Sequence, residues 1–216
     1  MKLTVITATY QRPDAFRLCE KYLARQTRQP DQWLVLDGKD RMQKKVLDCI
    51  EAGEVTGDMV AFIEDDDWYR SDYLSWVYTQ IMRGYELVGE GNAAYYNVVS
   101  RWSSECLNVR HAALCATSLH KDLLGSVANI IKSYDWPFFD TRIWPLQVNK
   151  KLFLPKTPKE RRVVGIKGIR STAHKPGYSG EHHDIHPSGT RRDPSLLQLF
   201  KWIGNDAAAY SAFRTI

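Results

Sequence analysis

The sequence has no apolar run of the ~20 residues that a helix needs to span a bilayer. The apolar run that begins at Leu3 ends at Thr7, which is too short for a secretory signal, and no small-residue cleavage site follows it. We therefore expect a cytoplasmic protein that has no membrane partner. Nothing in the sequence indicates an oligomeric state.

Cysteine is scarce, and its four positions are far apart without a CxxC pair. This spacing does not match structural zinc sites, so we interpret the cysteines as reduced thiols. Repeats and low-complexity tracts are also absent. With 216 residues, 44% of them hydrophobic and 25% charged, the chain has the size and composition of one folded domain.

Strands and helices alternate through the first 90 residues. Apolar runs end at Thr7, Leu36 and Ile63, and the segments between them repeat apolar residues at helical spacing. This alternation predicts an α/β fold with a mainly parallel central sheet and helices on both faces. Ligands of such sheets bind at the carboxyl ends of the strands.

Later elements are expected as strands at 87–88 and 94–99 and as helices at 119–131 and 138–148. Residues 155–192 are rich in Pro, Gly, Lys, Arg and His, which predicts a long functional loop. We expect a single domain, 1–216, with a nucleotide-sugar-binding half (1–90), an acceptor half (91–154), a basic lid loop (155–192) and C-terminal helices (193–216).

Four consecutive carboxylates directly follow the third strand; we call Glu64, Asp65, Asp66 and Asp67 the acidic cluster. Such charges repel one another unless a cation compensates them. Mg²⁺ or Mn²⁺ prefers carboxylate oxygens and leaves coordination positions free for a diphosphate. The alternative is a solvated acidic turn that caps the next helix.

Two further strand ends lie on the same edge of the predicted sheet. They are the loop from Thr7 to Arg12 and the turn at Asp37. Asp37 can accept a hydrogen bond from a uracil or ribose group, or it can serve only as a turn residue before Gly38. Together with the acidic cluster, these segments predict a nucleotide site.

Residues 4–12, 35–38 and 62–74 resemble, in this order, the motifs of family 2 glycosyltransferases of GT-A fold. The resemblance implies transfer from a nucleoside-diphosphate sugar, with a UDP-sugar favoured, and inversion at the anomeric carbon. It aligns the metal-binding motif with Glu64, Asp65 and Asp66, with Asp67 just beyond; Asp66 is the favoured ligand. It implies nucleotide-sugar contacts at Thr7, Ala8, Thr9, Tyr10, Arg12, Asp37 and Asp65.

Inversion requires a general base under the acceptor hydroxyl. The resemblance implies that this base lies at the start of a later helix, where Asp135 and Asp140 are the candidates. We favour Asp140. A role for Asp140 as a helix N-cap is equally open.

Three histidines, His182, His183 and His186, crowd the predicted lid loop. The resemblance implies that one of them completes the metal site, whereas surface histidines without a ligand are the alternative. A separate zinc site is disfavoured by their spacing. Lys167 lies among glycines that allow hinge motion, and we expect it to face the diphosphate.

The formal charge of +5, concentrated after residue 150, favours an acidic acceptor. We expect a hydroxymethylated pyrimidine in DNA, as for DNA-modifying phage enzymes, with an extruded base stacked on Tyr95, Tyr96, Trp102 or Trp136. A saccharide or protein acceptor is the alternative.

An alternative from another functional class is a non-catalytic nucleotide- or DNA-binding protein of this fold. A nucleotidyltransferase is disfavoured because the loop after the first strand has no glycine.

Overall fold

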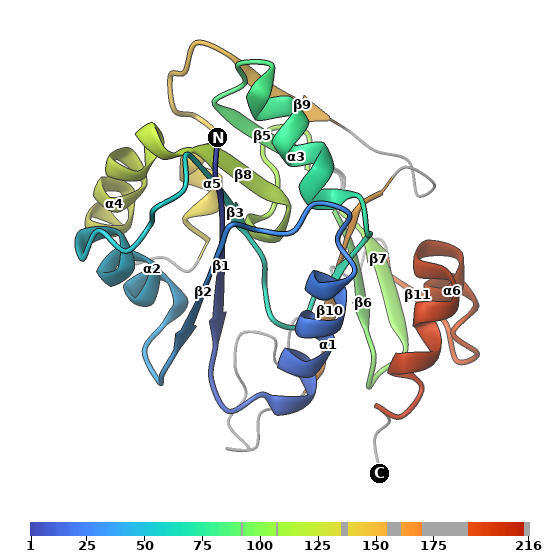
Figure 1. Cartoon of the computed structure of the whole chain (residues 1–216). Helices are drawn as coiled ribbons and strands as arrows, with labels where there is room; N and C mark the ends of the chain where they lie inside the picture. Colours follow the sequence, from blue (N-terminus) through green and yellow to red (C-terminus); the bar gives the residue numbers. More distant parts are fainter. Residues whose placement is uncertain (92, 107, 135–137, 155–160, 170–189, 214–216) are drawn as a thin grey trace.

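The computed structural model describes residues 1–91, 93–106, 108–134, 138–154, 161–169 and 190–213. Its centre is a six-stranded sheet with the strand order β2-β1-β3-β8-β5-β9 (Figure 1). In chain order these strands are β1 (Leu3–Thr9), β2 (Gln32–Asp37), β3 (Met59–Phe62), β5 (Leu87–Glu90), β8 (Thr117–His120) and β9 (Lys151–Leu154).

The pairing within this sheet is mainly parallel. β1 runs parallel to both β2 and β3, with Thr9 opposite Asp37 and Ile6 opposite Phe62. β5 and β9 are also parallel, whereas β8 is antiparallel to β3 and β5. The predicted α/β architecture is therefore confirmed, with one reversed strand. The ends of β1, β2 and β3 meet at one edge.

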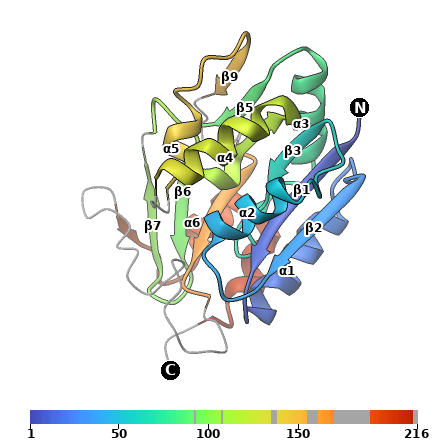
Figure 2. The same cartoon turned by 90° about the vertical axis from the view of Figure 1, so that its left-hand side faces the viewer.

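Helices cover both faces of the central sheet, with α2 and α4 on one face and α1 and α3 on the other (Figure 2). The amphipathic pattern explains their placement: α1 begins at Pro13 and turns Leu18, Tyr22 and Leu23 inward. The helices are α1 (Pro13–Ala24), α2 (Met42–Glu51), α3 (Tyr73–Met82), α4 (Leu124–Ser133), α5 (Asp140–Ile143) and α6 (Leu197–Ile203), with 3₁₀ turns η1 (Leu114–Ala116), η2 (Lys121–Leu123) and η4 (Gly204–Tyr210).

A second, five-stranded sheet has the order β11-β7-β6-β10-β4. It lies at the lower right of Figure 1. Its middle part matters for the site, because β10 is parallel to β6 and antiparallel to β4, the strand that follows the acidic cluster. The strands are β4 (Trp68–Tyr69), β6 (Ala94–Asn97), β7 (Trp102–Glu105), β10 (Val163–Lys167) and β11 (Arg191–Arg192).

Three expected elements differ from the structure. The predicted loop 155–192 contains β10, which is buried along its whole length. The predicted helix 119–131 is divided, because its first residues belong to β8 and α4 begins only at Leu124. The predicted helix 138–148 is reduced to the single turn of α5. Periodicity alone cannot separate short buried strands from helices, and these differences have that cause.

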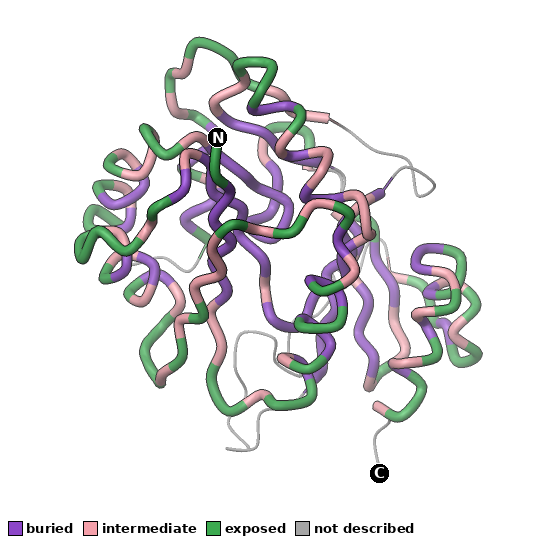
Figure 3. The backbone as a smooth tube through the Cα atoms, in the orientation of Figure 1, coloured by how far each residue is buried: buried purple, intermediate pink, exposed green. Residues whose placement is uncertain are grey.

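The core follows the strands of the two sheets, where the buried segments concentrate (Figure 3). The carboxyl-terminal part is tied to it through Asp206 of η4. This carboxylate accepts a hydrogen bond of 2.8 Å from the indole Nε1 of Trp68 and pairs with Arg25. Within the described residues, no helix combines the length and the apolar character needed to cross a bilayer.

Candidate functional site

The acidic cluster lies where β1 and β3 end side by side. The backbone N–H of Ile63 donates to Ile6 over 3.0 Å, which continues the β1–β3 pairing up to the cluster. The hydroxyl of Thr9, the last residue of β1, donates to Asp65 over 2.8 Å. The predicted convergence of the first strand end and the carboxylates is therefore present.

Asp65 and Asp66 share one arginine. Arg12 donates from Nη1 to Asp65 over 2.6 Å and from Nη2 to Asp66 over 2.7 Å. Burial raises the pKa of Asp65 to about 6, against the charge of Arg12. Burial also acts on Asp66, but Arg12 and then Lys167 hold the pKa of Asp66 below its ordinary value. Asp66 is thus the most firmly ionised member of the cluster.

Glu64 and Asp67 face Lys167 at the end of β10. The ammonium lies 3.3 Å from Asp67 Oδ1 and 3.7 Å from Glu64 Oε2, and 3.9 Å from Asp66 Oδ2. Asp67 is fully buried and accepts a 2.8 Å hydrogen bond from the backbone N–H of Ile166. Burial raises the pKa of Asp67 well above its ordinary value and also raises that of Glu64, each against the charge of Lys167.

The charges of this site do not balance. Among the described residues, Arg12 and Lys167 are the two bases in ion pairs with the four carboxylates, which leaves an excess of negative charge when all four are ionised. Asp67 Oδ2 is buried without a hydrogen-bond partner. Ligand atoms of Glu64, Asp67 and Cys115 lie within 4.8 Å of one another. The carboxylate oxygens in this group fit a divalent cation, which would also reduce the repulsion between the four carboxylates.

Asp140 lies beside this cluster. It is the first residue of α5, is 7% exposed, and interacts with the backbone of Leu114, the residue before Cys115. Burial and then the nearby charge of Glu64 raise the pKa of Asp140 to about 7. A carboxylate with a pKa near neutrality next to an anionic site is suited to proton transfer.

The end of β2 lies beside the end of β1 at the same edge of the central sheet. Asp37 is exposed and accepts from the backbone N–H of Gly38 over 2.7 Å, as a turn residue does. The ammonium of Lys45 on α2 donates to the backbone oxygens of Thr9 over 2.8 Å and Gly38 over 3.0 Å. Lys45 thus joins the ends of β1 and β2. Lys45 was not predicted as a site residue, because in the sequence it is one polar position of an amphipathic helix.

The predicted nucleotide loop divides into an inner and an outer part. Thr7 is fully buried and its hydroxyl accepts from Trp33 Nε1 over 3.0 Å, so its side chain supports the loop from inside. Ala8 is partly buried, and Tyr10 is 37% exposed. Among these three residues, Tyr10 has the side chain most open to a ligand.

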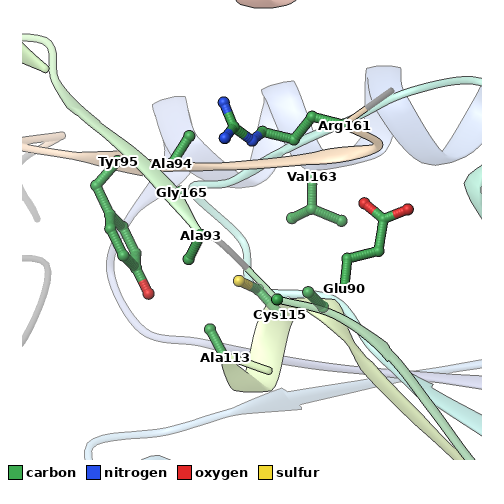
Figure 4. A pocket seen from close by; sticks show the side chains of 11 residues that line it. Glu90, Ala93, Ala94, Tyr95, Ala113, Cys115, Arg161, Val163 and Gly165 are labelled. Carbon is green, nitrogen blue, oxygen red and sulfur yellow. The ribbon is translucent and has the colours of Figure 1, made fainter. Parts of the chain in front are cut away.

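A small pocket opens next to the cluster, between the two sheets. Figure 4 shows the Tyr95 ring and the Glu90 carboxylate on opposite sides of it, with Arg161 above. Its walls are otherwise small, with Ala93, Ala94, Ala113, Ala116, Gly91 and Gly165. Cys115 belongs both to this wall and to the group with Glu64 and Asp67, so the pocket borders the acidic cluster. Glu90, Cys115 and Arg161 were not predicted as site residues; Cys115 was interpreted only as a reduced thiol, and Arg161 only as part of the basic excess.

Several predicted residues lie outside the described residues, namely Asp135, Trp136, His182, His183 and His186. Of the residues expected to stack a base, Tyr96 is fully buried and donates to Asp193 O over 3.2 Å, so that part of the prediction is wrong. Arg161 was counted in the basic excess after residue 150, yet it is 4% exposed and pairs with the exposed Glu105. Lys167, expected to face a diphosphate, is 9% exposed and pairs with the acidic cluster.

Comparison with known proteins places the fold. No protein-family model matches the chain, and no curated protein matches it in sequence. The structure of S. aureus TarS 1–349 matches with a TM-score of 0.53 and 16% identity, over 77% of this chain and 60% of that one. The same fragment in complex with UDP-GlcNAc matches with a TM-score of 0.52 and 16% identity, over 77% and 59% of the two chains.

A third match is a glycosyltransferase involved in the glycosylation of the major capsid of PBCV-1, with a TM-score of 0.50 and 9% identity over 76% of this chain and 93% of that one. The chain thus spans about three fifths of the TarS fragment and most of the capsid enzyme. At these identities the likeness shows a shared fold, which is the α/β architecture of GT-A type expected from the sequence.

Proposed function

We propose that this chain is a glycosyltransferase that moves a sugar from a nucleoside-diphosphate sugar, with a UDP-sugar favoured, to an acceptor hydroxyl. The observation that carries the proposal is the incompletely neutralised acidic cluster at the ends of β1 and β3, with Asp140 beside it. The fold supports it, because the structures it resembles include a UDP-GlcNAc complex of TarS and a second glycosyltransferase.

The donor side of the reaction is assigned to the first 90 residues. Asp37, exposed at the end of β2, accepts from the uracil or ribose, and Tyr10 and Thr9 line the same edge. Asp66 is the favoured ligand of a Mg²⁺ or Mn²⁺ ion, with Glu64, Asp65 and Asp67 around it. His182, His183 or His186 would complete the metal site. When bound, the ion supplies Lewis-acid stabilisation to the leaving diphosphate.

Asp140 is the favoured general base, with Asp135 as the alternative. Its carboxylate takes the proton of the acceptor hydroxyl while the acceptor oxygen attacks the anomeric carbon. The bond from this carbon to the diphosphate breaks on the opposite face, so the configuration inverts. Among the described residues, Lys167 and Arg12 are the cations paired with the acidic cluster, and they are assigned to the departing negative charge.

For the acceptor, the low exposure of three basic residues after residue 150, namely Arg161, Arg162 and Lys167, favours a saccharide or protein hydroxyl over DNA. Binding to DNA depends on cations that reach phosphates at the surface. Arg161 and Lys167 are occupied inside the fold, and Arg162 pairs with the buried Glu90 over 2.7 Å. A hydroxymethylated pyrimidine in DNA remains the second candidate because Arg191 and Arg192 are exposed.

A thermal-shift panel of UDP-, GDP- and dTDP-sugars, with and without Mn²⁺, tests the donor assignment. We expect a metal-dependent rise in the unfolding midpoint for one donor, and hydrolysis of that donor that is lost in Asp66→Ala. Asp48→Ala is the matched control, because Asp48 is exposed and pairs only with the exposed Lys44 in the described residues. Donor binding without hydrolysis would instead indicate a non-catalytic nucleotide-binding protein.

The acceptor assignment is tested by offering hydroxymethylated DNA and a saccharide panel to the protein loaded with that donor. Sugar transfer to a saccharide, with no gel shift of DNA at low salt, is the expected result. Glycosylation of the DNA that weakens as salt rises would overturn the preference for a saccharide or protein acceptor.

A further inference from the structure

Arg12 joins three segments that are far apart in the chain. Its Nη1 contacts Asp65 over 2.6 Å, and its Nη2 contacts Asp66 over 2.7 Å and the backbone oxygen of Ile169 over 3.3 Å. Its side chain is only 14% exposed. We call this set of contacts the Arg12 latch. It connects the loop after β1, the acidic cluster and the residues that follow β10.

The oxygens held by the latch are those that a ligand would need. Arg12 approaches Asp66 Oδ2 more closely than Lys167 does, at 2.7 Å against 3.9 Å. A divalent ion bound to that oxygen at roughly 2.0–2.2 Å would lie within contact range of the guanidinium. Two cations at such a distance repel each other strongly in a buried site. Arg12 and an ion on Asp66 therefore compete for the same negative charge in the present geometry.

The loop that carries Arg12 is strained at one position and fixed on both sides of it. Gln11 has a φ of 49°, a left-handed conformation that is strained for a residue with a side chain. Thr9, two residues earlier, is held on both sides, by Lys45 and by Asp65. On the other side, the backbone oxygen of Arg12 accepts from Phe16 in the first turn of α1. These contacts fix the backbone at Thr9 and at the carbonyl of Arg12, so the guanidinium can leave the carboxylates by rotation of the Arg12 side chain while its neighbours keep their contacts.

We propose that Arg12 is an internal counter-ion that keeps the acidic cluster occupied until a divalent ion and the donor enter together. The guanidinium then leaves the carboxylates and binds the donor diphosphate, because its paired N–H donors suit phosphate as well as carboxylate. The latch keeps metal affinity low in the absence of donor and couples the two binding events. This inference rests on the proposed function.

The test is a Mn²⁺ titration of the full chain, followed by EPR of free Mn²⁺, with and without UDP. Wild type is expected to bind Mn²⁺ weakly alone and on the order of tenfold or more tightly with UDP, since coupling of two ligands commonly has this size. Arg12→Met is expected to bind Mn²⁺ alone on the order of tenfold more tightly than wild type, and to lose most of the UDP effect.

Arg17→Met is the matched control, because Arg17 lies in the first turns of α1, is 73% exposed and pairs with the exposed Asp14. It should behave as wild type. Arg12→Lys retains the charge without the fork and is expected to give an intermediate affinity, which keeps the test available if Arg12→Met does not fold. Thermal unfolding gives a second readout: in EDTA, Arg12→Met should melt below wild type and gain more from Mn²⁺.

The outcomes distinguish a failure of the Arg12 latch from a failure of the proposed function. If wild type binds Mn²⁺ and UDP but Arg12→Met and Arg12→Lys bind Mn²⁺ alone no more tightly than wild type, the latch is wrong and the proposed function stands. If wild type binds neither UDP nor Mn²⁺ in any combination, the proposed function fails, and the latch fails with it.

Discussion

The two halves of the acidic cluster differ in what holds them. Asp65 and Asp66 are bound by a side chain from a loop, through the guanidinium of Arg12. Asp67 is bound by a strand, because the backbone N–H of Ile166 in β10 donates to its carboxylate, and Lys167 follows on the same strand. A loop side chain can be exchanged for a ligand, whereas a buried backbone hydrogen bond cannot be given up cheaply.

This difference assigns separate tasks to neighbouring carboxylates. The Asp65–Asp66 half is held by a contact that a ligand can replace, whereas Asp67 is held by β10 through Oδ1 and can offer Oδ2 to a ligand. Glu64 belongs to neither group fully, since it is half-buried, contacts Lys167 and raises the pKa of Asp140. Variants of these residues should therefore fail in different ways.

The largest effect on catalysis is expected at Asp140, beside the Glu64 side of the cluster. Asp140→Asn should lower kcat by about 10²–10⁴, the usual contribution of a general base, with UDP affinity retained. Steady-state kinetics and UDP binding measure the two quantities. Transfer activity within a few-fold of wild type would remove Asp140 from the role of base and leave Asp135 as the candidate.

Asp66→Asn should lower kcat/KM by about 10²–10³, because it removes the firmly ionised carboxylate that we propose as the metal ligand. Its unfolding midpoint should change little, since the amide oxygen still accepts from Arg12 and the repulsion between carboxylates falls. Asp48→Asn provides the control. An inactive variant that is also largely unfolded would contradict the separation of tasks.

Asp67→Ala should instead lower the free energy of unfolding by about 3–5 kcal/mol, the cost of removing one partner from a buried ion pair. It leaves Lys167 and the N–H of Ile166 with fewer partners in a buried position. Urea unfolding measures the loss. A variant of wild-type stability without activity would mean that both halves of the cluster bind ligands.

The activity of the wild type should rise about tenfold per pH unit up to a pH near 7 and then level off, because the base works as a carboxylate and burial raises the pKa of Asp140 to about 7. The same shift acts on stability. The folded state binds this proton more tightly than the unfolded chain, so this group lowers stability as pH rises from the ordinary value of 3.8 to about 7.

The comparison of wild type with Asp140→Asn isolates both effects. The variant should lack this part of the pH dependence in urea unfolding, and its residual activity should lack the inflection near neutrality. Parallel profiles for the two proteins would show that another group titrates.

The smallest effect is expected at Lys45, which supports the Asp65–Asp66 half indirectly by holding Thr9. Lys45→Met should raise KM for the donor by roughly tenfold with little change in kcat, because charge-assisted hydrogen bonds contribute about 1.5–3 kcal/mol. Lys44→Met, which changes an exposed residue of the same helix, should leave KM unchanged. A fall in kcat alone would argue against a positioning role for Lys45.

The first part of the fold was predictable because its signals are local. β1, β2 and β3 are continuous apolar runs closed by polar turns, and α1, α2 and α3 repeat apolar residues at helical spacing. The second sheet was not, because β4 and β11 have only two residues each and β10 lies in a stretch rich in charge and glycine. The strands of the second sheet can be identified only from their pairing with other strands, which the sequence does not show.

The same limit applies to the site. The acidic cluster and Asp37 could be located from strand ends, whereas the position of Lys167 depends on β10 pairing with β4 and β6. Arg161 looks like surface charge in the sequence, since composition does not distinguish a solvated cation from a buried one. Lys167 was predicted to face a diphosphate, but its pairing with the acidic cluster was not predicted. Lys45 was hidden for a related reason, as a polar position on an amphipathic helix.

The pairing of Asp67 with β10 has a consequence for biosynthesis. The carboxylate and its partners at Ile166 and Lys167 are about a hundred residues apart. A nascent chain on the ribosome therefore has Arg12 to pair with Asp65 and Asp66, but it lacks the partners of Glu64 and Asp67 until β10 has been translated. Closing so long a loop is slow relative to local helix formation. Glu64 and Asp67 should accordingly acquire their native environment later than Asp65 and Asp66.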